Sequence, residues 1–215
     1  MYSDEVALSL LDSIGSDAAL VVGEHSDRSL GDLAHDPALE TIPVFRALWR
    51  QNGVAGRVRT DRFAGMLLRF LHGATAAPEA RATFMLRYAG RTSRCRVARV
   101  LLLLLDQADD RIKAEVIGRL FARFLAESIE EGEMLEAGRR LLDVELDDLR
   151  RLANTPRVAD LEGKLLARLA HEGLVDGPEA RAWGHGDVTW HTSAVTDLGG
   201  LLLDCLRLAE PRGVR

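Results

Sequence analysis

Hydrophobic positions recur with the period of an α-helix along most of the chain. From Thr60 onward, large apolar side chains stand at i, i+3, i+4, i+7 and i+8, which places them on one helical face: Phe63, Met66, Leu67, Phe70 and Leu71. The run from Leu101 to Leu105 is apolar on every side. A helix of that kind is typical of a protein interior, so we expect it at the buried centre of a helical bundle.

Start and stop signals delimit the other predicted helices. Ser3 is a candidate N-cap for a helix that ends at Gly15, and Ile42-Pro43 opens a helix that ends near Asn52-Gly53. The same apolar period predicts four more helices, over Glu79–Ala89, Ser93–Gln107, Arg111–Ala126 and Glu131–Leu152.

The last 60 residues follow a different pattern. A short helix is predicted at Asp147–Ala153, and a longer one at Val158–Glu172 follows a turn. The Gly-rich stretch 184–187 precedes the β-prone residues 188–191, which predicts a hairpin with its tip at 184–187. Thr196 is expected to cap a final apolar helix. The predicted fold is therefore mainly α, with a helical bundle over 1–145 and a small C-terminal unit over 146–215 that contains one β-hairpin.

Charge is segregated along the 215 residues, although the formal net charge is only −5. Residues 1–40 carry nine acids and one Arg, residues 41–100 carry twelve Arg and two acids, and residues 101–215 carry twenty-two acids and fifteen bases. An acidic total argues against a dedicated nucleic-acid binder, because phosphate contact needs a positive face. The basic block, residues 41–100, could supply such a positive face.

Three sets of Arg in this block fall on common helical faces by sequence spacing. They are Arg46, Arg50 and Arg57 (if one helix continues past Gly53 and Gly56), Arg62 and Arg69, and Arg87, Arg91 and Arg94. One interpretation is an anion-binding surface for nucleic acid, anionic lipid headgroups or an acidic partner. The other is internal neutralisation by the acidic residues 1–40 and by the region Glu127 to Asp148.

The C-terminal order of helix, turn, helix, "Gly173-Leu174-Val175", hairpin and "Thr196-x-x-Gly199" is similar to a winged helix. The resemblance covers about a quarter of the chain and implies that the second helix is the recognition helix and the hairpin the wing. Its contact residues would be Arg157, Lys164, Arg168, His171 and Arg181. The predicted recognition helix would also hold Asp160, Glu162 and Glu172, and many winged helices bind proteins instead of DNA.

The middle of the chain resembles an uncharacterised bacterial helical family over about residues 40–150. The matching stretches are Ile42–Val44, Asp61–Phe63, Leu67–Leu71 and Lys113–Phe121. This resemblance implies a helical fold and a bacterial origin, and it implies no activity.

The sequence contains few candidate catalytic or metal-binding residues. His185, Asp187 and His191 could supply two imidazoles and a carboxylate to Zn or Fe, but a solvated hairpin tip is the favoured interpretation. Cys95 stands among Arg94, Arg96 and Arg99, and it is interpreted as a buried structural thiol. Phosphate-loop, dinucleotide and nucleophile-elbow motifs are absent. We therefore expect no catalytic residues, no metal and no cofactor.

Compartment signals indicate a cytoplasmic protein. The N-terminus lacks the positive region of a signal peptide, no apolar run approaches 20 residues, and two cysteines make no disulfide framework. We expect a non-enzymatic bacterial interaction or regulatory protein that binds a protein partner or itself through the Arg-rich face and the winged-helix-like module. The alternatives are a sequence-specific DNA-binding regulator, and a membrane-acting or phage-defence effector that uses the amphipathic helix from Thr60.

Overall fold

The computed structural model describes residues 2–14, 39–52, 57–176, 179–182, 188–191 and 194–210. At 52, at 57–61 and in the two strands it describes the backbone only. The described chain is mainly helical, as predicted. It divides into two compact units, Met1–Met134 and Leu135–Arg215, each of which is described here by itself.

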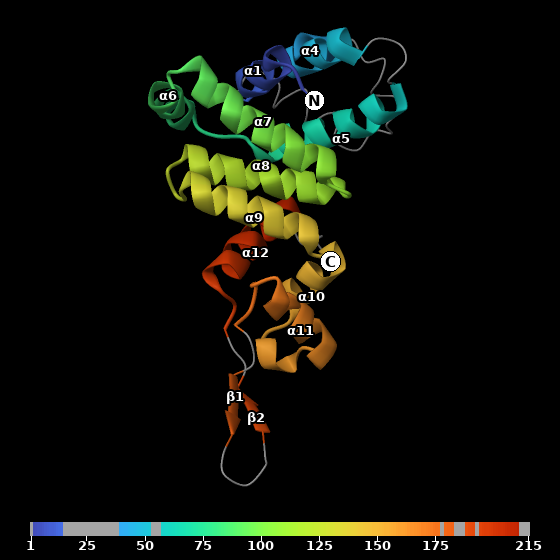
Figure 1. Ribbon diagram of the computed structural model, residues 1–215, viewed down its shortest axis with the longest axis vertical. Helices are drawn as coiled ribbons and strands as arrows, with labels where there is room; N and C mark the ends of the chain where they lie inside the picture. Colours follow the sequence, from blue (N-terminus) through green and yellow to red (C-terminus); the bar gives the residue numbers. More distant parts are fainter. Residues whose placement is uncertain are drawn as a thin grey trace. The chain divides into compact units, whose positions relative to one another are not determined.

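The helices of unit 1 are α1 (Asp4–Ser13), α4 (Pro43–Asn52), α5 (Arg57–Gly73), α6 (Pro78–Arg87), α7 (Arg91–Gln107) and α8 (Arg111–Leu125) (Figure 1). The helices α5 and α8 pack most extensively against each other. Their contact contains Phe70 and Phe121, whose ring centroids are 6.1 Å apart, and both side chains are fully buried. The predicted cap of α1 is confirmed, because Val6 N donates to Ser3 Oγ at 3.3 Å.

The predicted central helix is largely buried, with one exception. In α7, Leu101, Leu102 and Leu105 are at most 1% exposed, whereas Leu103 is 52% exposed. The expectation of burial on every side is therefore wrong for Leu103. One face of α7 therefore lies at the surface of unit 1, and neighbouring helices cover its other faces.

Unit 2 contains the end of α9 (Glu131–Asp143) and the helices α10 (Leu146–Asn154), α11 (Gly163–His171) and α12 (Asp197–Ala209). The predicted helix Glu131–Leu152 is interrupted before Leu146, because Glu145 has extended backbone angles and serves as the N-cap of α10. The division between the units falls inside α9, earlier than the predicted boundary after residue 145. Arg140, in the second half of α9, pairs with Glu172 of unit 2 at 3.8 Å, so this half of α9 belongs to the C-terminal unit.

Strands β1 (Glu179–Ala182) and β2 (Val188–His191) pair antiparallel, with Glu179 opposite His191. Separately from these strands, Val175 forms an antiparallel bridge with Val195, and Thr196 N donates to Leu174 O at 3.1 Å. Thr196 Oγ1 then accepts from Gly199 N at 3.0 Å, which confirms the predicted cap of α12. The predicted tip, residues 184–187, lies outside the described residues.

Candidate functional site

The first predicted Arg set is divided between two helices. Arg46 and Arg50 are exposed on α4, which ends at Asn52, and α5 begins at Arg57. The expectation that Arg57 continues their face is therefore wrong, and its side chain lies outside the described residues. Arg46 Nε donates to Glu40 O at 3.1 Å, and Arg50 lies 3.7 Å from the carboxylate of Glu5.

The second set, Arg62 and Arg69, lies on α5 and makes two different contacts. Arg62 is exposed, and its Nη2 donates to Ala108 O at 3.2 Å. Arg69 is about three-quarters buried and donates to Glu115 at 3.3 Å. These two guanidinium groups therefore support the packing of α5 on its neighbours.

The third set also spans two helices. Arg87 ends α6, whereas Arg91 and Arg94 begin α7, so single-helix spacing does not apply to all three. Arg87 lies 3.8 Å from Glu127 and 3.4 Å from Glu130. Arg91 is exposed, and Arg94 is half-buried with no acceptor for its Nε.

Apart from Glu115, which pairs with Arg69, the acidic partners described for the Arg of the basic block come from the regions that the internal-neutralisation interpretation named. Arg99 pairs with Asp4, Arg96 pairs with Glu131 at 2.8 Å, and Arg50 and Arg87 use Glu5, Glu127 and Glu130 as described above. Most of these pairs are exposed and weakly stabilising, about 0–1 kcal/mol each. They nevertheless reduce the positive potential that a nucleic acid would meet on unit 1.

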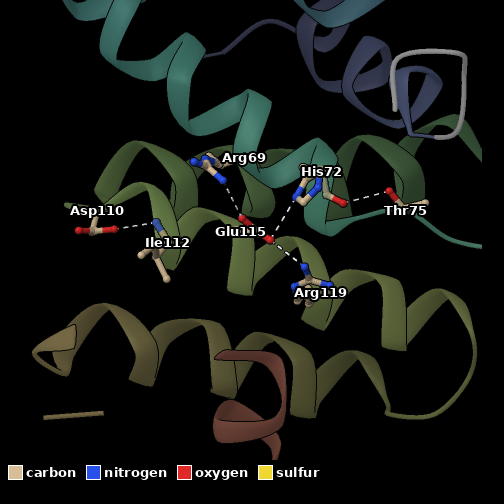
Figure 2. A network of polar contacts seen from close by, with 7 residues as sticks. All are labelled: Arg69, His72, Thr75, Asp110, Ile112, Glu115 and Arg119. Carbon is tan, nitrogen blue, oxygen red and sulfur yellow. Dashed lines mark hydrogen bonds and ion pairs between the residues drawn. The ribbon is translucent and has the colours of Figure 1, made fainter. Parts of the chain in front are cut away.

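The buried carboxylate of Glu115 is the centre of a polar cluster between α5 and α8 (Figure 2). Its Oε1 accepts from Arg119 Nη2 at 2.7 Å and lies 3.1 Å from His72 Nδ1, while its Oε2 accepts from Arg69. Glu115 is 1% exposed, and such a carboxylate must be paired and hydrogen-bonded. The cluster fixes the position of α5 on α8.

Of this cluster, sequence reasoning selected Arg69 only. Glu115 and Arg119 have the i, i+4 spacing of a helical ion pair, and His72 follows Arg69 by one helical turn. That signal is weak, because spacing within one helix does not show that Glu115 of α8 faces Arg69 and His72 on another helix.

In unit 2 the predicted contact residues occupy different environments. Arg168 makes two hydrogen bonds to Asp148 of α10, at 2.7 and 2.8 Å, and these bonds raise the pKa of its guanidinium. Lys164 and His171 are exposed on the same helix, α11. Arg157 is exposed before α11 and lies 3.5 Å from Asp160, while the side chain of Arg181 lies outside the described residues.

A cavity of about 410 Å³ opens between the start of α10 and α11. Its lining includes the apolar Val144 and Leu169, the acids Asp143, Glu145, Asp148 and Glu172, the base Arg168, and His171. Sequence reasoning missed this acidic rim, because Asp143 and Glu145 precede α10 and are brought beside α11 only by the fold.

The amphipathic face of α5 is part of the core. Phe63, Met66, Leu67 and Phe70 are each at most 5% exposed, so the stripe that the membrane hypothesis required at the surface is covered. Among the described helices, none is both long and apolar enough to cross a bilayer.

The remaining candidates are only partly described. His185 and Asp187 lie outside the described residues, and the backbone alone is described at His191. In the described part of the chain, no three His, Cys, Asp or Glu side chains are grouped as metal ligands would be. The side chains of Cys95 and Cys205 are both buried.

Comparison with known proteins adds no relative: no family model, curated protein or solved structure matches this chain.

Proposed function

We propose that this chain is a non-enzymatic bacterial interaction protein that binds a protein partner through a winged-helix-like module formed by α10, α11 and the β1–β2 pair. The order of helix, helix and antiparallel strands supports the winged-helix comparison. In that comparison α11 is the recognition helix, and its open side carries Lys164, Arg168 and His171.

The observation that carries the proposal is the mixed charge around α11. Four carboxylates line the cavity that Arg168 and His171 also line. A phosphate backbone would be repelled by that acidic rim, whereas a protein surface can present cations to it and acids to Lys164. Unit 2 as a whole carries fourteen acids against eleven Lys and Arg, which points in the same direction.

The test uses charge reversal on the full-length protein. Lys164 and His171 are exposed, so Lys164→Glu with His171→Glu should leave the fold intact. Arg139→Glu, at an exposed position of α9, is the matched control. The wild-type chain is used to capture a partner from its bacterial source, the partner is purified, and the Kd is measured for each variant.

We expect the double variant to weaken binding at least tenfold and the control to leave the Kd unchanged, because only the former alters the α11 face. Equal affinities for all three proteins would contradict the proposal. Self-association is the same proposal with a second copy as partner, and sedimentation of the wild type and the double variant would detect it.

DNA binding is the second candidate, and one observation favours it. No acid lies among residues 164, 167, 168 and 171, which recur at i, i+3, i+4 and i+7 on α11. A duplex DNA panel tests it: retarded mobility at 50 mM salt that disappears at about 200 mM would establish a phosphate-contacting face. If the protein does not retard DNA at 50 mM salt, binding of a protein partner remains the proposed function.

A further inference from the structure

Unit 1 contains a second cavity, of about 300 Å³, between α1, α6 and α8. Its wall is formed mainly by Leu11 of α1, Phe84 of α6, and Phe121 and Leu125 of α8. All four side chains are at most 8% exposed. An apolar wall with few polar groups, at the lower end of the usual size range of about 300–1,000 Å³, is typical of a small-molecule site.

Arg81 supplies the charge at this cavity. It is half-buried, its Nη1 donates to Ile14 O at 3.3 Å, and its Nε has no acceptor. Among the described residues it forms no ion pair, unlike Arg69 and Arg119, which both contact Glu115. A guanidinium binds a carboxylate through two parallel N–H groups, and among the described contacts the bond to Ile14 uses Nη1 alone.

We propose that this cavity binds a small amphipathic carboxylate, with its acid group on Arg81 and its apolar body against Leu11, Phe84, Phe121 and Leu125. Arg81 lines the cavity and has no acid partner among the described residues, so a ligand carboxylate would supply a counter-charge to its guanidinium. The apolar body of the ligand would fill the empty space between these four side chains. This site lies in unit 1, and the inference is independent of partner binding by unit 2.

Asp12 also lines the cavity and is exposed. Its carboxylate opposes an anionic ligand, so the proposal requires Arg81 to dominate the local field. The sign of the charge on the preferred ligand therefore tests the assignment directly.

The experiment is calorimetric titration of the full-length protein with octanoate and with octylammonium, which share a chain and differ in the sign of the head group. We expect one octanoate per chain, weaker binding of octylammonium, and a modest gain in octanoate affinity for Asp12→Asn. Arg81→Gln should weaken octanoate binding about ten- to hundredfold, as loss of a charged hydrogen-bond pair does. Arg94→Gln is the matched control, because Arg94 is also half-buried with an orphan Nε but does not line the cavity.

A steric pair of variants provides a second readout. Ala82 and the neighbouring Thr83 are both exposed, but only Ala82 lines the cavity. Ala82→Trp should abolish octanoate binding, and Thr83→Trp should leave it unchanged. Octanoate should also shift the methyl resonances of Leu11 and Leu125 in the wild type, a measurement that needs no variant to fold. The proposal is overturned by an absence of saturable octanoate binding, by equal or tighter binding of octylammonium, or by unchanged affinity in Arg81→Gln.

Discussion

A carboxylate as deeply buried as that of Glu115 is stable only while hydrogen-bond donors surround it. Arg69, Arg119 and His72 provide those donors, and each of the three side chains is itself partly accessible to solvent. Replacing a buried ion pair as a whole is often neutral, whereas removing one partner leaves an uncompensated charge. The cluster is therefore most sensitive to loss of its single acid.

Glu115→Gln should lower the free energy of unfolding by about 3 kcal/mol or more, because two guanidinium groups lose their counter-charge in a half-buried position. Urea denaturation measures the change. Glu79→Gln, at an exposed position of α6, is the control and should change stability by less than about 0.5 kcal/mol. A loss for Glu115→Gln as small as that of the control would show that the cluster does not hold α5 on α8.

Tyr88 provides a pH-dependent prediction. Burial, together with the 2.8 Å hydrogen bond that its hydroxyl donates to Glu131, raises its pKa above the ordinary 10. The folded protein thus holds this proton more tightly than the unfolded chain. The resulting stabilisation is complete below pH 10 and is lost as pH rises through the folded pKa.

The measurement compares wild type with Tyr88→Phe by urea denaturation at pH 8 and at pH 10.5. At pH 8 the variant should be less stable by about 1 kcal/mol, the usual contribution of such a hydrogen bond. The difference should shrink at pH 10.5, because only the wild type has a phenol to ionise. A difference that stays constant between the two pH values would contradict the assigned shift.

Site residues were harder to predict than helices. The Arg block in residues 41–100 is plain in the sequence, but its pairing with Asp4, Glu5 and Glu131 depends on which helices meet. Helical spacing relates residues within one helix only. It therefore failed for Arg87, Arg91 and Arg94, where the end of α6 intervenes.

At the scale of elements, apolar periodicity and capping residues predicted most helices of unit 1. The predicted Ser93–Gln107 corresponds to α7 at Arg91–Gln107, and the predicted Arg111–Ala126 to α8 at Arg111–Leu125. The predicted short helix Asp147–Ala153 corresponds to α10 at Leu146–Asn154. The predicted Glu131–Leu152 extends past the end of α9 at Asp143, since Val144 and Glu145 include no Gly or Pro to mark a break. The extended backbone of Glu145 is set by tertiary packing, and Val144 is buried there.

The close approach of α5 and α8 depends on a glycine in each helix. A Cβ at Gly118 would overlap the carbonyl oxygen of Phe70, and a Cβ at Gly73 would overlap that of Glu115. These two positions let the backbones touch at the level of the Glu115 cluster. Larger residues would separate the helices and the groups that they pair.

Gly118→Ala should therefore destabilise the protein by about 1–3 kcal/mol, the usual cost of overpacking, although alanine favours helix elsewhere. Gly132→Ala is the matched control in α9, where an added Cβ meets nothing within 4 Å. That variant should gain up to about 1 kcal/mol. Thermal or urea unfolding measures both, and a stabilised Gly118→Ala protein would contradict the close contact.

At the scale of the whole molecule, acidic and basic segments that are separate in the sequence form ion pairs with each other in unit 1. Arg of the basic block meet acids from residues 1–40 and from 127–131, so the block is not by itself an anion-binding surface. The division into two units places the proposed partner-binding surface and the proposed ligand cavity in different units. Each can therefore be tested without disturbing the other.

Hydrogen exchange of the full-length protein, alone and saturated with the purified partner, tests the central claim most directly. The account predicts added protection in α11, Gly163–His171, and at the start of α10, because these segments surround the mixed-charge cavity. It predicts no change in α5 or α8. Protection confined to unit 1, with α11 exchanging as in the free protein, would contradict the claim that this chain binds its partner through the winged-helix-like module.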